Sequence, residues 1–207
     1  MLKIWGRRNS VNVQKVLWCA AELGLEYERI DAGLQFGNNK EPWYLALNPN
    51  GRVPLVQDGE LALWESNTIV RYLCATHDHG GLYPREPRRR AVAEKWMDWQ
   101  LSTLARPVSI VFQNLVRTPP GSRDLGAVAT CAAEANEAFT LLDRHLHAQR
   151  FVGGDTFSMG DIPVGALAHR WLALDGLERP AWPAVERWLV ALGARPAFRE
   201  HVMLPLS

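Results

Sequence analysis

The sequence has 207 residues, enough for one large or two small domains with a buried core and no need of stabilising disulfides. Its 23 Lys and Arg residues against 22 Asp and Glu residues give a formal net charge of +1. This balance excludes the one-signed field that nucleic acid or an anionic membrane would attract, so we expect no nucleic-acid partner and no membrane partner.

The first 78 residues alternate strand-like and helix-like segments. The expected elements, in chain order, are a strand at 2–5, a helix at 13–23, strands at 27–32, 54–57 and 61–64, and a helix at 67–74. Asp58-Gly59 separates the last two strands and favours a tight turn, so these strands should be antiparallel. The order β-α-β, loop, β-hairpin, α is that of a thioredoxin-like domain, a mixed sheet with helices on its faces.

The second half of the sequence predicts helices alone. Residues 79–87 read HGGLYPREP, and the density of Gly and Pro indicates a linker. Apolar residues at spacings of three and four then predict helices at 88–116, 124–149, 159–175 and 182–193. We therefore expect an α/β plus all-α protein, with a thioredoxin-like domain over 1–78, a linker over 79–87 and a helical-bundle domain over 88–207.

The cysteines and the start of the sequence bear on the cellular compartment. Cys19, Cys74 and Cys131 each lie in a run rich in Ala, Leu or Val, with no CxxC motif and no Cys/His cluster, which favours buried thiols in a reducing compartment over disulfides or a zinc site. The first residues do not resemble a signal peptide, and no stretch approaches about 18 apolar residues. We expect a soluble cytoplasmic protein without a metal.

A structural motif begins one helix of the second half. Phe157-Ser158-Met159-Gly160-Asp161-Ile162 reads as a capping box with a hydrophobic staple, in which Ser158 caps the helix and the Asp161 carboxylate reaches back. We interpret Ser158 and Asp161 as structural residues that start a buried helix.

Four segments in order carry a resemblance over almost the whole length: RRNSVNVQKV, NPNGRVP, ESNTIVRYL and FSMGDI. With them the chain resembles cytosolic glutathione S-transferases, of the bacterial theta-like or nu-like kind that uses a serine or an asparagine. The resemblance implies that glutathione is a co-substrate, that no further cofactor is needed, and that the protein forms a homodimer. No tyrosine lies in residues 1–26, which disfavours the classes with an N-terminal catalytic tyrosine.

The γ-glutamyl end of glutathione has an expected site where a strand ends and a helix begins. The resemblance implies that Glu65, Ser66 and Asn67 bind it: the Ser66 hydroxyl and free backbone N–H groups take the carboxylate, and Glu65 pairs with the ammonium. In the alternative, Ser66 or Asn67 is a plain N-cap and Glu65 a favourable charge at a helix N-terminus.

The rest of glutathione is expected to contact the loop before the hairpin. Val53-Pro54 resembles the cis-proline turn of the family, which leaves the Val53 backbone free to pair with the cysteinyl unit; the alternative is a trans proline at the start of an edge strand. Lys40 and Arg52 are candidates for the glycyl carboxylate, although an exposed lysine is most often only solvated.

The candidate catalytic residues precede the first helix. Unpaired N–H groups at a helix N-terminus favour the thiolate, the nucleophilic form of the sulfur. Ser10 matches the catalytic serine of theta-like classes, and Asn12 matches the asparagine of nu-like relatives. The alternative is that Ser10 simply caps the helix.

The function that these residues imply is activation of the glutathione thiolate for attack on a small hydrophobic electrophile. Its pocket should lie between the loop after the first strand and the first long bundle helix, where Arg106 and Arg117 are weaker candidates, since exposed bundle arginines are common. Two alternatives stay open: a glutathione-dependent disulfide reductase or peroxidase, and a non-catalytic protein-binding module that has kept the fold.

Overall fold

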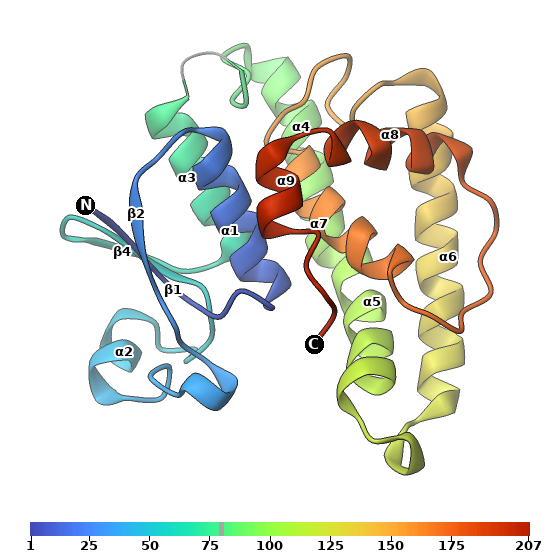
Figure 1. Cartoon of the computed structure of the whole chain (residues 1–207). Coiled ribbons are helices and arrows are strands. Elements are labelled where there is room, and N and C mark those ends of the chain that lie inside the picture. The colour runs from blue at the N-terminus through green and yellow to red at the C-terminus, as the bar shows by residue number, and fades with distance from the viewer. Residues whose placement is uncertain (79–80) are drawn as a thin grey trace.

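A computed structural model describes residues 1–78 and 81–207 (Figure 1). A small sheet with its helices lies beside a larger group of helices, so the predicted thioredoxin-like domain followed by a helical domain is confirmed. The expected linker at 79–87 includes residues 79 and 80, which lie outside the described residues. The next helix begins at Pro87, and the exact domain boundaries stay a prediction.

The four strands form one mixed sheet in the order β2-β1-β3-β4. Their bounds are β1 (Leu2–Trp5), β2 (Tyr27–Ile30), β3 (Leu55–Asp58) and β4 (Leu61–Leu63). Strand β1 pairs in parallel with β2 and antiparallel with β3, where Ile4 lies opposite Val56, and β3 pairs antiparallel with β4. Because side chains alternate along a strand, Ile4 joins the main core while Trp5 packs on the other face with Tyr44 and Leu55.

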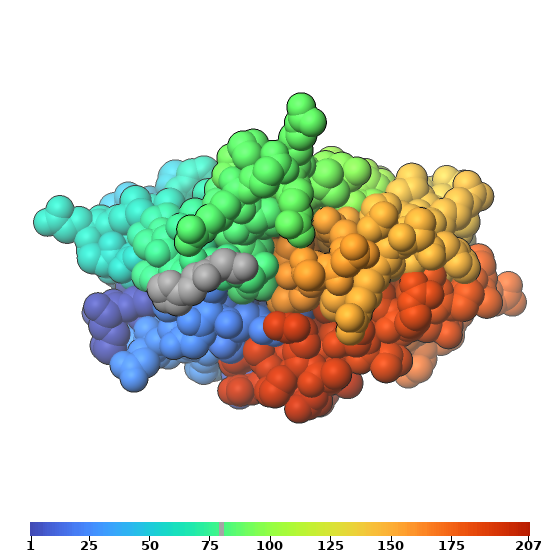
Figure 2. Space-filling view, turned by 90° about the horizontal axis from the view of Figure 1, so that it is seen from above, coloured from blue at the N-terminus to red at the C-terminus, as the bar shows by residue number. Residues whose placement is uncertain are grey.

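Helix α1 is the element that joins the two halves. The helices of the first half are α1 (Val11–Glu22), α2 (Pro42–Leu47) and α3 (Ser66–His77). Helix α1 packs against α3 and also against α7 (Asp161–Leu172) and α9 (Pro196–His201) of the bundle. Figure 2 shows the C-terminal segment, in red, lying beside the N-terminal residues, in blue. Helix α1 is therefore held by both halves.

The remaining bundle helices are α4 (Pro87–Trp99), α5 (Ala105–Phe112), α6 (Leu125–Ala148) and α8 (Pro183–Gly193). The expected continuous helix at 88–116 contains two wider π-helical turns, Gln100–Leu104 and Gln113–Arg117. The first turn precedes Pro107, which has no N–H to donate to the Thr103 carbonyl and crowds it, a cause of local widening. In the described part of the chain, no helix has the length and apolar character needed to cross a membrane.

Several local predictions are wrong by a few residues. Helix α1 begins at Val11 and not at residue 13, and the hairpin turn consists of Gly59 and Glu60, with Gly59 at φ +59°. The sequence pattern also missed α2 and α9, each six residues long, and the short 3-10 turns Leu34–Phe36 and Pro120–Ser122. Segments this short present too few apolar positions to establish a period.

The predicted capping box before α7 is only partly correct. Gly160 is the N-cap residue, and the Ser158 hydroxyl donates to the Asp161 carboxylate instead of capping the backbone. Asp161 does reach back, because its carboxylate accepts from the Ser158 backbone N–H at 2.9 Å. It is fully buried and also accepts from the Val152 N–H and from Trp188 Nε1, both at 2.9 Å. The motif therefore joins a loop, α7 and α8.

All three cysteines are buried free thiols, as predicted. Cys19 on α1 and Cys74 on α3 are nevertheless in contact, with their Sγ atoms 3.5 Å apart. This hydrogen bond and burial raise the pKa of the Cys19 thiol well above its usual value. The pair is consequently a packing contact between the two helices.

Candidate functional site

The loop after β1 brings Ser10 to the N-terminus of α1. Ser10 is the N-cap residue, with φ −85° and ψ 119°, and its side chain makes no capping hydrogen bond. It is only 8% exposed, and no partner for its hydroxyl is found among the described residues. The first-turn N–H groups and the helix dipole favour an anion at this point. The Ser10 hydroxyl is therefore a free donor at an anion-attracting position.

Asn12 lies in the first turn of α1 and faces α3. Its Oδ1 accepts a hydrogen bond from the Ser66 hydroxyl at 3.3 Å. The structure thus places the loop that carries Ser10 next to the start of α3. The N-termini of α1 and α3 converge there, and their dipoles add to the same positive potential.

Glu65 and Ser66 form the turn into α3. Glu65 is the N-cap residue at φ +70°, in a region that residues other than glycine seldom adopt and that marks functional turns. Its side chain makes no capping hydrogen bond and is exposed, while Ser66 is 6% exposed. The simple capping alternative therefore has no hydrogen bond to support it at this turn.

Asn67 has a different environment from its two neighbours. It is buried, and its Nδ2 donates to the Met97 carbonyl oxygen at 2.8 Å and to Gln100 Oε1 at 3.2 Å. The amide of Asn67 is thus turned toward the bundle and fixes α3 against it. Its placement is that of a residue that positions the turn.

Lys15 is a buried cation beneath this turn that the sequence prediction missed. It is 1% exposed, and its Nζ donates to Gln100 Oε1 at 2.9 Å, to Asn67 Oδ1 at 3.4 Å and to Ser66 Oγ at 3.5 Å. Burial, followed by the nearby charge of Arg170, lowers the pKa of Lys15 to about 7. The one available signal in the sequence was a lysine inside the apolar run from Val13 to Ala20.

Replacing Lys15 with methionine is expected to change how stability depends on pH. The Lys15 pKa is about 7 in the folded protein and 10.5 for an ordinary lysine, so between pH 7 and pH 10.5 the unfolded chain binds a proton that the folded protein does not. Stability of the wild type should then rise with pH over this window, by up to about 1.4 kcal/mol per pH unit from this group, and Lys15→Met should lose that slope.

The measurement for Lys15 is urea unfolding of both proteins from pH 7 to pH 10. Lys95→Met, at an exposed position on α4, is the matched control and should keep the wild-type slope. Equal slopes in wild type and Lys15→Met would show that Lys15 is not held with a lowered pKa.

The loop before β3 presents unpaired backbone groups. The Val53-Pro54 peptide bond is cis. Within the described residues, neither the N–H nor the carbonyl of Val53 makes a hydrogen bond. The preceding carbonyl, that of Arg52, accepts from the Tyr44 hydroxyl at 2.7 Å and from Asn48 Nδ2 at 2.8 Å. The loop is therefore held from behind while the Val53 backbone is left free for an added strand.

Lys40 and Arg52 lie on adjacent parts of the same loop region. Both side chains are exposed, and neither forms an ion pair with a described residue. A Cβ atom built on Gly51 would lie 2.8 Å from Lys40 Nζ, which places this ammonium over the turn just before Arg52. Lys40 thus lies over the turn that leads into Arg52 and the half-buried Val53.

Arginines from the bundle also reach the loop before α1. Arg170 on α7 donates from Nη2 to the Asn9 carbonyl oxygen at 3.1 Å. Arg117 donates to the main-chain oxygen of Ser207, and Asn9 Nδ2 donates to the same oxygen. The weaker candidate Arg106 instead pairs with Glu134 on the bundle surface at 3.0 Å. Arg170 was missed, although an arginine inside the apolar run of α7 was a signal.

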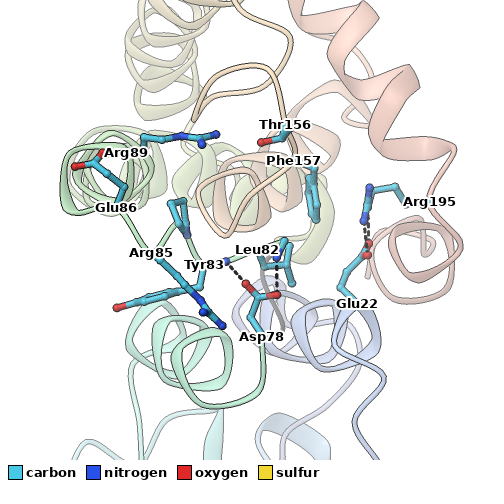
Figure 3. A pocket seen from close by; sticks show the side chains of 12 residues that line it. Glu22, Asp78, Leu82, Tyr83, Arg85, Glu86, Arg89, Thr156, Phe157 and Arg195 are labelled. Atoms are coloured by element: carbon cyan, nitrogen blue, oxygen red, sulfur yellow. Dashed lines mark hydrogen bonds and ion pairs between the residues drawn. The ribbon is translucent and has the colours of Figure 1, made fainter.

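A separate cavity of about 710 Å³ lies at the other end of α1 and α3 (Figure 3). Its wall includes Glu22, at the C-terminal end of α1, and Arg195, whose guanidinium forms two hydrogen bonds with that carboxylate at 2.6 and 2.7 Å. Because α1 has 12 residues, about 18 Å of helix separates this cavity from Ser10. The candidate site is the other end, where the free donors converge.

Comparisons with known proteins agree with this geometry. The family model described as "Glutathione S-transferase, N-terminal domain" matches residues 1–75, and "Glutathione S-transferase, C-terminal domain" matches residues 126–191. The chain is 45% identical to glutathione S-transferase GstB of Escherichia coli K12, with 100% of each chain covered. It is 32% identical to glutathione S-transferase 3 of Zea mays, covering 97% of this chain and 93% of the relative.

A solved structure is similar throughout. It is the theta class glutathione S-transferase from Xanthomonas axonopodis pv. citri with glutathione bound, which is 45% identical in sequence. The TM-score is 0.96, and the match covers 100% of this chain and 99% of that one.

Proposed function

The chain belongs to the glutathione S-transferase family, and from this premise we propose that it activates the glutathione thiolate for attack on small electrophiles. In the reaction the sulfur forms a bond to an electrophilic carbon, and a leaving group departs with its electron pair. The protein contributes positioning and electrostatic stabilisation, with no covalent enzyme intermediate.

The observation that carries the proposal is the free hydroxyl of Ser10. It is a buried N-cap side chain without a hydrogen bond among the described residues, at a helix N-terminus that favours an anion. In the proposal this hydroxyl donates to the thiolate. Asn12 has its amide oxygen engaged with Ser66, which supports a positioning role for Asn12.

The remaining residues bind the two ends of glutathione. Glu65, Ser66 and the N–H groups at the start of α3 take the γ-glutamyl end, and the buried Lys15 holds Ser66 from beneath by a hydrogen bond to its Oγ. The Val53 backbone before Pro54 pairs with the cysteinyl unit. Lys40 and Arg52 take the glycyl carboxylate as two exposed cations that form no ion pair with the described residues. Asn67 holds the turn from the bundle side.

The experiment that tests this function compares products. Purified protein is incubated with glutathione and 1-chloro-2,4-dinitrobenzene, and separately with glutathione and hydroxyethyl disulfide, each against the uncatalysed rate. We expect catalysed formation of the thioether from the aryl halide. Turnover of the disulfide alone, with oxidised glutathione as product, would instead establish the reductase alternative.

The same sample distinguishes the non-catalytic alternative. A folded protein that turns over neither substrate and is not retained on immobilised glutathione would be a binding module that has kept the fold. The homodimer and the cytoplasmic location belong to the proposal as well.

A further inference from the structure

Three guanidinium groups from distant parts of the chain gather around the loop before α1. Arg7 belongs to this loop, Arg117 ends the second π-helical turn, and Arg170 lies on α7. The Cζ atoms of Arg170 and Arg117 lie 4.2 and 4.9 Å from the centre of the same Phe112 ring. We call Arg7, Arg117 and Arg170 the arginine cluster.

Among the described residues, no Asp or Glu side chain neutralises the arginine cluster. Across residues 1–78 and 81–207, none of its members forms an ion pair with an Asp or Glu side chain. Burial, followed by the charges of Arg117 and Arg7, lowers the pKa of Arg170 to about 9. Burial and the charge of Arg117 likewise lower the pKa of Arg7. Like charges held together and partly buried cost free energy, so an anion bound among them would be strongly favoured.

Unused donors point to the same conclusion. Arg170 is 8% exposed, and its Nε is buried without a hydrogen-bond partner. The Nε of Arg7 is also buried and unpaired. Arg117 and Arg7 are only half-buried, so their guanidinium groups stay within reach of a ligand. Each cation thus retains donor capacity that the described protein atoms leave unfilled.

The position of Arg7 places the arginine cluster at the reacting end of the site. A Cβ atom built on Gly33 would lie 2.9 Å from Arg7 Nη1 and 3.3 Å from Val53 Cγ1. Arg7 therefore lies beside the residue assigned to the cysteinyl unit, and Ser10 follows three residues later. The two carboxylates of glutathione are assigned elsewhere, to Ser66 and to Lys40 with Arg52.

The geometry already accommodates an oxygen acceptor at this point. Arg117 Nη2 donates to a backbone oxygen of Ser207 at 2.9 Å, and Asn9 Nδ2 donates to the Ser207 hydroxyl at 2.9 Å. An oxygen of a ligand can take up the same donors of Arg117 and Asn9. A planar guanidinium suits a carboxylate in particular, because it can donate two parallel hydrogen bonds.

We propose that the second substrate is an electrophile carrying a carboxylate, and that Arg117 and Arg7 bind this carboxylate while the glutathione sulfur attacks. The inference rests on the proposed function and names its substrate class. In the step the carbon–sulfur bond forms and the carbon–halogen bond breaks, halide leaves with the electron pair, and the carboxylate is unchanged. Arg170 is a positioning residue, since it holds the Asn9 carbonyl and supports the Phe112 ring.

The experiment compares 4-chloro-3,5-dinitrobenzoate with 4-chloro-3,5-dinitrobenzamide, which share the reacting ring and differ in charge. The readout is the ratio of kcat/KM for the benzoate to that for the benzamide. Arg117→Gln should lower this ratio at least about tenfold, the effect of losing a hydrogen bond to a charged group. Arg7→Gln should lower the same ratio, and it provides a second, independent test if the Arg117→Gln protein does not fold.

Arg106→Gln is the matched control, because Arg106 is an exposed bundle arginine already paired with Glu134. It should keep the wild-type ratio. The pKa of the bound glutathione thiol is measured in parallel from its ultraviolet absorbance. Equal losses on both substrates, together with a raised thiol pKa, would assign the arginine cluster to the thiolate and overturn the proposal.

Two further outcomes separate this inference from the proposed function. If the wild type conjugates the benzamide and leaves the benzoate unreacted, the carboxylate proposal fails and the transferase function stands. If neither ring is conjugated while glutathione is oxidised, the proposed function itself fails.

Discussion

Replacing Ser10 with alanine is expected to lower kcat/KM for an aryl halide by about a hundredfold, the size of effect seen when one preorganised donor to a developing or bound anion is removed. The Ser10 hydroxyl is the free donor at the N-terminus of α1, and without it the thiolate keeps only the helix dipole and nearby cations. The pKa of the bound thiol should rise toward the value of a free thiol, about 8.5.

The change should act on chemistry and leave the fold intact. Since the hydroxyl makes no capping hydrogen bond, Ser10→Ala is expected to alter the free energy of unfolding by less than about 1 kcal/mol. The KM for glutathione should change little, because the γ-glutamyl and glycyl ends are bound by other residues. Steady-state kinetics, absorbance titration of the bound thiol and urea unfolding measure these three quantities.

Asn12→Ala is the matched comparison for Ser10→Ala. Asn12 contacts Ser66 through its Oδ1, so its loss should raise KM for glutathione more than it lowers kcat. A Ser10→Ala protein that keeps its activity within about threefold, beside an Asn12→Ala protein that loses most of it, would assign the sulfur to the asparagine amide.

The largest expected loss of stability follows replacement of Asp161 with asparagine. The carboxylate accepts four hydrogen bonds, from the Val152 and Ser158 N–H groups, from the Ser158 hydroxyl and from Trp188 Nε1. An asparagine has one acceptor oxygen, and its NH2 group would face at least one of these donors. Leaving buried donors without acceptors should cost about 3 kcal/mol, which lowers Tm by roughly 6–12 °C for a chain of this size.

Differential scanning fluorimetry at pH 7.5 measures this loss. Burial raises the pKa of Asp161 to about 6, so the carboxylate is mostly ionised at that pH. Asp155→Asn is the control, since Asp155 is an exposed residue of the same loop and its replacement should leave Tm unchanged. A similar Tm for wild type and Asp161→Asn would show that the four hydrogen bonds do not hold the loop, α7 and α8 together.

The sequence predicted the fold well where local patterns are long or have clear ends. Strand β1 was predicted at its observed bounds, and α6 and α8 were predicted to within about a residue at each end, because their apolar periodicity ends at turn residues. The hairpin was placed one residue early, since both Asp58 and Gly59 tolerate turns and only the pairing of the strands decides. The six-residue α2 and α9 were missed because they are shorter than two helical turns.

The residues of the candidate site also differ in how far the sequence alone could identify them. Ser10, Glu65 and Ser66 were selected from the resemblance, supported by their place where a helix begins, which the sequence reveals locally. The isomer of the Val53-Pro54 bond and the roles of Lys40 and Arg52 came from the resemblance alone. Asn67 was expected beside glutathione, yet its amide is turned toward the bundle, because the helix rotation that decides this depends on packing against α4.

By itself, the sequence determined the order of the elements, the balanced charge and the turns from which a glutathione site can be built. Those features depend on neighbours a few residues apart. The tertiary structure alone decided that Lys15 lies beneath Ser66 and that Arg7, Arg117 and Arg170 surround one loop. Such contacts join residues separated by 50 or more positions in the sequence. Which helix faces pack together decides whether a buried Lys or Arg side chain meets a hydrogen-bond acceptor. Helix packing thus places lysine and arginine residues, which usually lie on the surface, beside the candidate site.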